Sequence, residues 1–274
     1  MLKKDFDLKP AKNFDGSWVQ GFTQNQENKI VMEGGKPVLR VKYPKGRIGP
    51  GVWGKPETYN ALNAVTVLDT PNTEDPEHPF TYTLEYYVKF ENVFDYKLGG
   101  KLPGLAGGLM PSGGRLIGDK YMEGGFTARF MWHMMGEGYS IPSIIEYIYH
   151  PGREGEIGKK IYGAGSTLGT PPRVDLNDRS LEGMLELKKD TWYKITQQIK
   201  PNTPNASDGT LKVWINGTLM SDMNNMKFIA DGKHGQYTVD RFFFSTFYGR
   251  GNVEQDALNY DTYARFKDIC VYVK

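Results

Sequence analysis

Hydrophobic and polar residues alternate in short runs along most of this chain. The clearest run is Phe80–Phe90, which alternates over its whole length, and Val38–Tyr43 shows the same pattern. Side chains of a β-strand point to opposite faces in turn, so this period predicts strands with one buried face. We expect further strands at Leu62–Leu68, Thr191–Lys200, Thr210–Ile215, Arg241–Tyr248 and Tyr263–Val273.

These regularly spaced strands predict an all-β fold. No segment shows the period of a helix longer than two turns, and no internal repeat is present. Asn216-Gly217 follows a predicted strand and suits the tight turn of a hairpin. Strands without intervening helices indicate an antiparallel two-sheet sandwich or jelly roll. No linker divides the chain, so we expect residues 1–274 to form a single domain.

Loops rich in glycine, proline or charge separate the predicted strands. Gly46–Gly54 is punctuated by glycine and proline, and Thr70–Pro79 is rich in proline and acid. The longest irregular segment is Gly152–Asp190. A loop of that length in a compact domain is usually functional or mobile.

Composition narrows the classes of partner. Apolar residues make up 39% of the chain and aromatic residues 13%, enough for a hydrophobic core. The net charge is +2 with acids interleaved among the bases, so we expect no nucleic-acid partner. No apolar run could span a bilayer, so we expect no membrane partner. The single Cys270 excludes an intramolecular disulfide and lies in a strand pattern typical of a buried structural thiol.

The stretch from Lys97 to Pro151 carries the candidate chemistry. Its first part, Lys97–Gly108, contains so many glycines that we expect neither an ordinary strand nor a helix there. We expect this part to let the backbone approach another group closely, with Lys101 embedded in it. A lysine inside a glycine-rich segment has little packing purpose.

Two strands are predicted after the glycine-rich part, over Gly125–His133 and Ile145–Tyr149. On the first, one face carries Thr127, Arg129, Met131 and His133; on the second, one face carries Tyr147 and Tyr149. Cations, a hydroxyl and two phenols would then converge on one sheet surface. Such a set suits an anionic, hydroxyl-rich ligand.

These stretches together resemble polysaccharide lyase family 14, which includes alginate and glucuronan lyases of chlorella viruses and molluscs. The resemblance rests on Gly99–Gly108, Arg129–Trp132 and Tyr147–Pro151, and on Phe243–Gly249 followed by Asp261–Asp268. It covers roughly residues 80 to 273, and the C-terminal part is also similar to family 20 glucuronan lyases. It implies a jelly roll with a cleft across its concave sheet, and β-elimination of a polyuronate without a cofactor or metal.

The resemblance also implies roles for individual residues. The family's lysine falls on Lys101, its arginine on Arg129 and its tyrosine pair on Tyr147 and Tyr149, whereas Thr127 stands where the family has serine. Cations beside the uronate carboxylate would stabilise an enolate-like intermediate. A tyrosine would then act as base and acid, and we expect Tyr149 slightly ahead of Tyr147.

Two departures from the family pattern leave the general base open. The segment Met134–Ser143 is longer than in the family, and His133 replaces a basic residue of another type. His133 lies about 20 Å along the strand from Thr127. We therefore expect Thr127 and His133 to bind substrate rather than to transfer the proton.

Two other function classes are compatible with parts of the pattern. A non-catalytic carbohydrate-binding jelly roll could use aromatic residues around the same cleft, since fold alone does not decide activity. A jelly-roll glycoside hydrolase would need two carboxylates facing one sugar, and no strand here carries a Glu-x-Asp or Glu-x-x-x-Glu pattern. We favour the lyase.

The remaining expectations concern the protein's setting. We expect a monomer whose partner is an acidic polysaccharide. The segment Met1–Asp7 lacks the apolar core of a signal peptide. From its substrate class we nevertheless expect a secreted or extracellular protein, virion association included.

Overall fold

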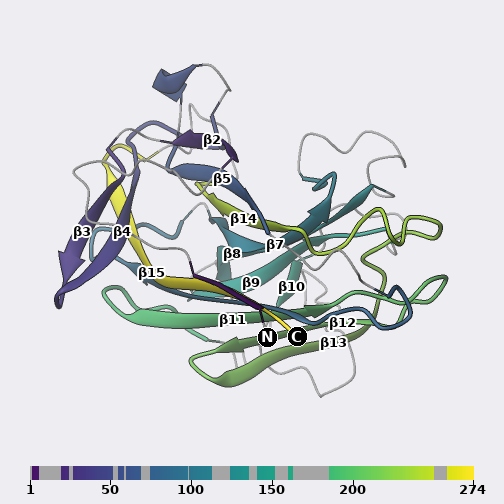
Figure 1. Cartoon of the computed structure of the whole chain (residues 1–274). Coiled ribbons are helices and arrows are strands. Elements are labelled where there is room, and N and C mark those ends of the chain that lie inside the picture. Colours follow the sequence, from purple (N-terminus) through teal and green to yellow (C-terminus); the bar gives the residue numbers. More distant parts are fainter. Residues whose placement is uncertain are drawn as a thin grey trace.

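Two antiparallel β-sheets pack face to face in a computed structural model of the chain (Figure 1). The structure describes residues 2–5, 20–24, 27–51, 55–58, 60–68, 75–97, 99–112, 124–135, 141–151, 160–162, 185–249 and 258–274. Within these residues the only helical turn is η1 (Pro56–Thr58). The predicted all-β antiparallel sandwich is confirmed.

The larger sheet has eight strands in the order β13-β12-β11-β6-β15-β4-β3, with β1 paired to β15. Its strands are β1 (Leu2–Asp5), β3 (Lys29–Glu33), β4 (Lys36–Tyr43), β6 (Tyr82–Phe90), β11 (Trp192–Lys200), β12 (Gly209–Ile215), β13 (Thr218–Met226) and β15 (Thr262–Val273). Asn216 and Gly217 both have positive φ, 51° and 82°, in the turn between β12 and β13. The predicted hairpin turn is therefore confirmed.

The smaller sheet has seven strands in the order β10-β9-β8-β7-β14-β5-β2. Its strands are β2 (Gln20–Gln24), β5 (Leu62–Val67), β7 (Gly100–Gly108), β8 (Gly125–Met135), β9 (Ile141–Tyr149), β10 (Lys160–Tyr162) and β14 (Arg241–Thr246). The candidate residues of the Lys97–Pro151 stretch lie on β7, β8 and β9, which are neighbours in this sheet.

The hydrophobic core fills the space between the sheets. The alternating residues of β6 that point inward, from Tyr82 to Phe90, are fully buried. Trp132 of β8 lies in an aromatic cluster with Tyr43, Phe94 and Tyr248, at ring-centroid distances of 5.2 to 5.6 Å. This packing fixes which face of β8 points inward, and so directs the odd-numbered residues from Thr127 to His133 to the opposite face.

The expectation that the glycine-rich part forms no ordinary strand is wrong. Gly100–Gly108 is strand β7, in the middle of the smaller sheet. Its pairing with β8 is interrupted by an irregularity between Leu102 and Leu105. Packing and ladder hydrogen bonds outweigh the entropic cost of glycine here, because the neighbouring chain leaves no space for side chains.

Gly104 shows that close approach most clearly. A Cβ atom at Gly104 would lie 1.9 Å from the backbone oxygen of Ala128 on β8. The expected close backbone approach is therefore present, although it is to the protein's own chain.

The other predicted elements fit with small changes at their ends. Cys270 is buried in β15, as expected. The described residues contain no helix long and apolar enough to cross a bilayer. Parts of the predicted loops and of the Met134–Ser143 segment, namely residues 52–54, 70–74, 136–140 and, apart from β10, 152–184, lie outside the described residues.

Candidate active site

The register of β8 and β9 brings the predicted residues together on the face of the smaller sheet that points away from the core. Thr127 pairs with Tyr149 and Arg129 pairs with Tyr147. Cross-strand partners on one face of a sheet have adjacent side chains. Each tyrosine therefore stands beside a residue of the Thr127–His133 set, as the sequence predicted. We call this surface the site face.

Arg129 occupies the centre of the site face. It is only 3% exposed, its Nη1 donates to Ser245 Oγ at 3.1 Å, and its guanidinium lies 4.8 Å from the centre of the Phe243 ring. Its Nε has no hydrogen-bond partner within the part of the chain that the structure describes. Burial lowers the pKa of Arg129 to about 10, an effect that the nearby tyrosines oppose, so the side chain stays charged at neutral pH.

No carboxylate among the described residues pairs with Arg129. Buried charges in proteins are normally paired, because an isolated charge is costly away from water. The described ion pairs of other arginines, such as Arg40 with Glu91 and Arg241 with Asp240, show the usual arrangement. A buried, uncompensated guanidinium is therefore suited to bind an anion that arrives from outside the chain.

Ser245 and Phe243 reach Arg129 from β14, on the far side of β7. Phe243 pairs with Gly104 of β7 in the sheet register. Because Gly104 has no side chain, no β7 side chain stands at this position between Phe243 and Arg129. The glycine therefore serves the site as well as the strand.

The two tyrosines form a hydrogen-bonded pair. Their hydroxyl oxygens are 2.6 Å apart and their rings meet edge to face at 5.1 Å between centroids. Tyr149 is 1% exposed, whereas Tyr147 is only partly buried. Of the two phenols, Tyr147 is therefore the one that an incoming ligand can reach.

Lys101 reaches the same area from β7. It pairs in register with Met131, and its Nζ is 2.9 Å from the Met131 sulfur and 3.6 Å from the centre of the Tyr147 ring. Lys101 is 7% exposed. The structure thus brings Lys101, Arg129 and the tyrosine pair together in one small area, where Tyr147 contacts Lys101 and pairs in register with Arg129.

Thr127 and His133 lie toward opposite ends of the row. The Thr127 hydroxyl is fully buried and donates to the Pro111 carbonyl at 2.7 Å, which ties the segment after β7 to the site face. His133 is buried and its Nδ1 lies 2.6 Å from the Met134 carbonyl, so Nδ1 carries a proton. His133 is about 13 Å along the strand from Arg129, at four residues' separation.

A buried carboxylic acid stands behind the tyrosines. Glu146 directly precedes Tyr147 in the sequence and pairs with Phe130, on the core side of β9. Among the described residues no group makes a well-formed hydrogen bond to its carboxyl oxygens, although the Ser221 hydroxyl lies close enough to affect them. Burial raises the pKa of Glu146 to about 8, and the neighbouring Ser221 hydroxyl offsets only part of this effect. Glu146 is therefore neutral at pH 7 and faces away from the site.

Within the described residues no group of three or more His, Cys, Asp or Glu side chains could hold a metal ion. The site face instead offers cations, phenols and an imidazole.

Sequence reasoning missed Ser245 and Phe243. The strand over Arg241–Tyr248 was predicted, but its hydrophobic run did not reveal which residues face outward. Phe242 and Phe244 enter the core, which turns Phe243 and Ser245 to the site face. The sequence feature that could have indicated the outward face of this strand is the small polar residue Ser245 within an aromatic run.

Comparisons with known proteins find one family and several structures similar to this chain. The family model of polysaccharide lyase 14 matches residues 31–269. None of the curated proteins matches the sequence.

Several solved structures share the fold. The marine PL-14 alginate lyase from Aplysia kurodai is 20% identical with a TM-score of 0.64, covering 94% of this chain and 91% of its own. Alginate lyase vAL-1 from Chlorella virus is 19% identical with a TM-score of 0.65, covering 94% of each chain. The endo-beta-1,4-glucuronan lyase from the fungus Trichoderma reesei is 11% identical with a TM-score of 0.53, covering 98% and 94%.

Proposed function

Because the chain belongs to polysaccharide lyase family 14, we propose that it cleaves a 1,4-linked polyuronate, polymannuronate or glucuronan, by β-elimination on the site face. One observation carries this proposal: the buried guanidinium of Arg129 has no carboxylate partner among the described residues. A uronate carboxylate would supply the missing anion. Bidentate pairing would also orient the sugar ring against the phenols.

The chemistry of β-elimination explains why a cation is needed there. The reaction removes the C5 proton of a uronate and expels the O4 substituent of the same ring. The C5 proton is weakly acidic because the adjacent carboxylate is already negative. Pairing that carboxylate with Arg129 and Lys101 stabilises the enolate-like intermediate, whose negative charge grows on the carboxylate oxygens.

We assign proton transfer to Tyr147, assisted by Tyr149. Tyr147 is the more exposed phenol, contacts Lys101 through its ring and pairs in register with Arg129. Tyr149 is buried and shares a hydrogen bond with it, so we propose that Tyr149 orients Tyr147 and stabilises its deprotonated form. This refines our expectation from the sequence, which placed Tyr149 slightly ahead.

The stereochemistry of the sugar favours a single acid–base residue. Mannuronate and glucuronate have the same configuration at C4 and C5, and in both the C5 proton and O4 lie on the same side of the ring. One phenol can therefore take the proton and return it to the leaving oxygen. Alginate lyase Aly36B, 20–21% identical to this chain, has been solved with alginate trisaccharide and tetrasaccharide, in variants with two residues replaced by alanine.

Incubation with purified polymers tests the proposal. Polymannuronate, polyguluronate and glucuronan are each treated with the protein in excess chelator, and the unsaturated uronate is followed by its ultraviolet absorbance. We expect product from polymannuronate or glucuronan, with less from polyguluronate, whose C5 configuration is opposite. Folded protein that yields no unsaturated product from any polymer would contradict the proposal.

A binding measurement in the same samples separates the two main alternatives. Retention on the polymers without any unsaturated product would favour the carbohydrate-binding module instead.

Since such polymers are found outside cells, we further propose that the protein acts there.

A further inference from the structure

The outer face of the larger sheet, on the opposite side of the molecule from the site face, carries a second group of aromatic and basic side chains. Strand register places Trp192 of β11 beside Lys89 of β6, and Tyr87 of β6 beside Lys267 of β15. All four side chains are partly exposed. We call Trp192, Tyr87 and Lys267 the outer patch.

Lys267 connects the two rings of the outer patch. Its Nζ lies 4.3 Å from the centre of the Trp192 ring and 5.4 Å from that of Tyr87. No carboxylate among the described residues pairs with Lys267, although its neighbours Lys89 and Lys194 are paired with Glu33 and Glu85. An ammonium group that is partly exposed and contacts rings but no described carboxylate can pair with an external anion.

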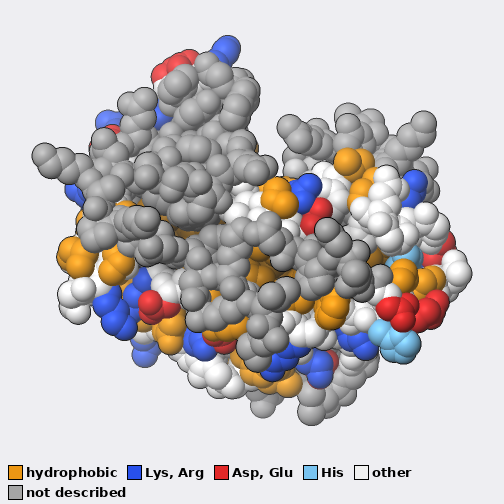
Figure 2. Space-filling view, viewed as in Figure 1, with side chains coloured by type: hydrophobic (Ala, Val, Ile, Leu, Met, Phe, Trp, Pro, Cys, Tyr) orange, Lys and Arg blue, Asp and Glu red, His pale blue; other side chains and the backbone are white. Residues whose placement is uncertain are grey.

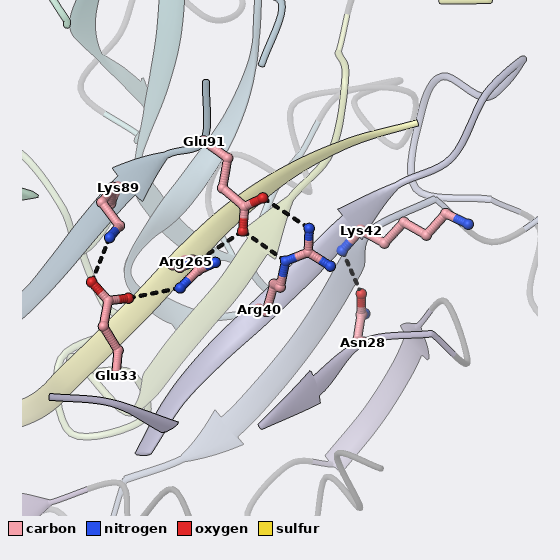
Figure 3. A network of polar contacts seen from close by, with 7 residues as sticks. All are labelled: Asn28, Glu33, Arg40, Lys42, Lys89, Glu91 and Arg265. Carbon is pink, nitrogen blue, oxygen red and sulfur yellow. Dashed lines mark hydrogen bonds and ion pairs between the residues drawn. The ribbon is translucent and has the colours of Figure 1, made fainter. Parts of the chain in front are cut away.

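An ion-pair network borders the outer patch and leaves it positively charged. Lys89, Arg265 and Arg40 stand in one row across three strands and share Glu33 and Glu91 (Figure 3). Together with Lys267, four cations face two carboxylates, an excess of two positive charges. Basic and hydrophobic side chains also mix along the lower edge of the molecule in Figure 2, where β11–β13 lie.

The combination of flat rings and an unpaired cation matches one ligand chemistry. The C–H faces of a sugar ring stack on Trp and Tyr, and a lysine beside the rings pairs with the carboxylate of the same sugar. We propose that the outer patch is a second, non-catalytic binding site for the acidic polysaccharide, distinct from the site face. This inference rests on the proposed function for the identity of the polymer.

The site face and the outer patch, on opposite faces of the sandwich, would together hold one long polymer or two polysaccharide chains of a gel. Holding substrate at a second position raises its effective concentration at the first. Short oligosaccharides cannot reach both faces, so they gain nothing from the outer patch. A substitution in the outer patch should therefore change the KM for polymer more than the KM for oligosaccharide, and this difference distinguishes a second binding site from an altered site face.

The first experiment compares Trp192→Ala and Lys267→Glu with the unaltered protein on long polymer and on a tetrasaccharide. We expect the KM for polymer to rise about three- to tenfold, as for loss of one aromatic or charged contact. The kinetic constants of each variant on the tetrasaccharide should stay within about twofold of those of the unaltered protein. Lys200→Glu is the matched control, because Lys200 is an exposed residue of the same strand as Trp192, about 26 Å along it.

An equal loss on both substrates, no loss on either, or the same loss in Lys200→Glu would overturn the proposal.

The second experiment needs no catalysis. In an Arg129→Ala background, migration is measured in gels containing the polyuronate, a neutral polysaccharide or polyglutamate. We expect the polyuronate to retard the protein, and Trp192→Ala or Lys267→Glu to abolish most of that retardation. Equal retardation by polyglutamate would show a charge effect without sugar recognition, and would overturn the proposal. If the unaltered protein forms no unsaturated product, the proposed function fails while this gel result still decides the outer patch.

Discussion

At the scale of single residues, the site depends on one charge that the protein itself does not neutralise. Arg129 is held by a hydroxyl and an aromatic ring, both of which leave its positive charge intact. A carboxylate partner within the chain would stabilise the folded protein but would compete with the substrate. A guanidinium without a described carboxylate partner is thus a local cost, which we propose serves substrate binding.

Replacing Arg129 by alanine should remove the charge-assisted contact with the uronate. A loss of about 2–4 kcal/mol in the transition state corresponds to about 30- to 1,000-fold in kcat/KM. Circular dichroism should show a folded protein, because Arg129 makes no ion pair among the described residues. The same estimate applies to Lys101→Ala. A variant with near-normal turnover would exclude that residue from the reaction.

Ser245 should act through Arg129. In Ser245→Ala the guanidinium loses its hydrogen bond, and we expect kcat/KM to fall about three- to tenfold, the size of one such bond. Ser221→Ala is the matched control, since Ser221 is also a buried strand hydroxyl but faces the core behind the site. Equal effects of the two changes on kcat/KM would argue for a general structural cause.

The tyrosine pair should separate into a reacting and an orienting residue. Tyr147→Phe should lose at least about 100-fold in kcat, as for removal of a general acid–base group. Tyr149→Phe should lose less, and should shift the pH dependence of kcat because Tyr147 loses its hydrogen-bond partner. His133→Ala should mainly raise KM. An inactive His133→Ala with two active tyrosine variants would make histidine the base.

At the scale of elements, β7 sets the geometry of the site, and its glycines are required by contact. A Cβ at residue 104 would lie 1.9 Å from a backbone oxygen of β8, so no rotamer change can relieve it. Gly104→Ala should therefore lower the free energy of unfolding by about 3 kcal/mol or more, or prevent folding. Gly217→Ala, where nothing lies within 4 Å but φ is +82°, should cost only about 1 kcal/mol. Urea unfolding of both variants measures the contrast, and similar stabilities would refute it.

Most strands were predictable because one face of each is buried and the other is not. β6 alternates over its whole length, and its predicted range differs by only two residues at one end. β7 was not predictable, because the partners that exclude side chains at Gly100 and Gly104 are residues of β8 and Phe247, which follows β14, all distant in sequence. β13 was missed because its exposed start, Thr218-Leu219, interrupts the alternation.

The candidate site was predictable in part, for the same reason. Strand parity alone placed Arg129 and His133 on one face, and the structure agrees. The contribution of β14 depends on sheet order, which no local pattern contains. The burial of Thr127 by Pro111 likewise depends on the course of a loop.

At the scale of the whole molecule, one buried acid should make stability depend on pH. Burial raises the pKa of Glu146 to about 8 from its ordinary value of 4.5. The folded state therefore keeps a proton that the unfolded state releases above about pH 4.5. The contribution of Glu146 to the free energy of unfolding is then fully present below about pH 4.5. It is lost as pH rises through about 8, where the buried carboxylate must ionise.

Glu146→Gln should remove this dependence. The variant and the unaltered protein should melt at similar temperatures near about pH 4.5, and the variant should be more stable by a few kcal/mol near about pH 9. Thermal unfolding at both values measures the difference. A difference in melting temperature between the two proteins that stays constant across this range would show that Glu146 is charged in the folded protein.

The strand order also constrains how the chain can be made. β14 lies between β7 and β5, and β15 lies between β6 and β4, so the last two strands occupy interior positions in opposite sheets. Until residues 241–273 leave the ribosome, each sheet exists as separate pieces with open edges. The two sheets cannot be completed strand by strand in the order of synthesis, and Arg129 acquires its Ser245 contact only after β14 has been made. Folding of the sandwich and completion of the site consequently wait for the same late segment of the chain.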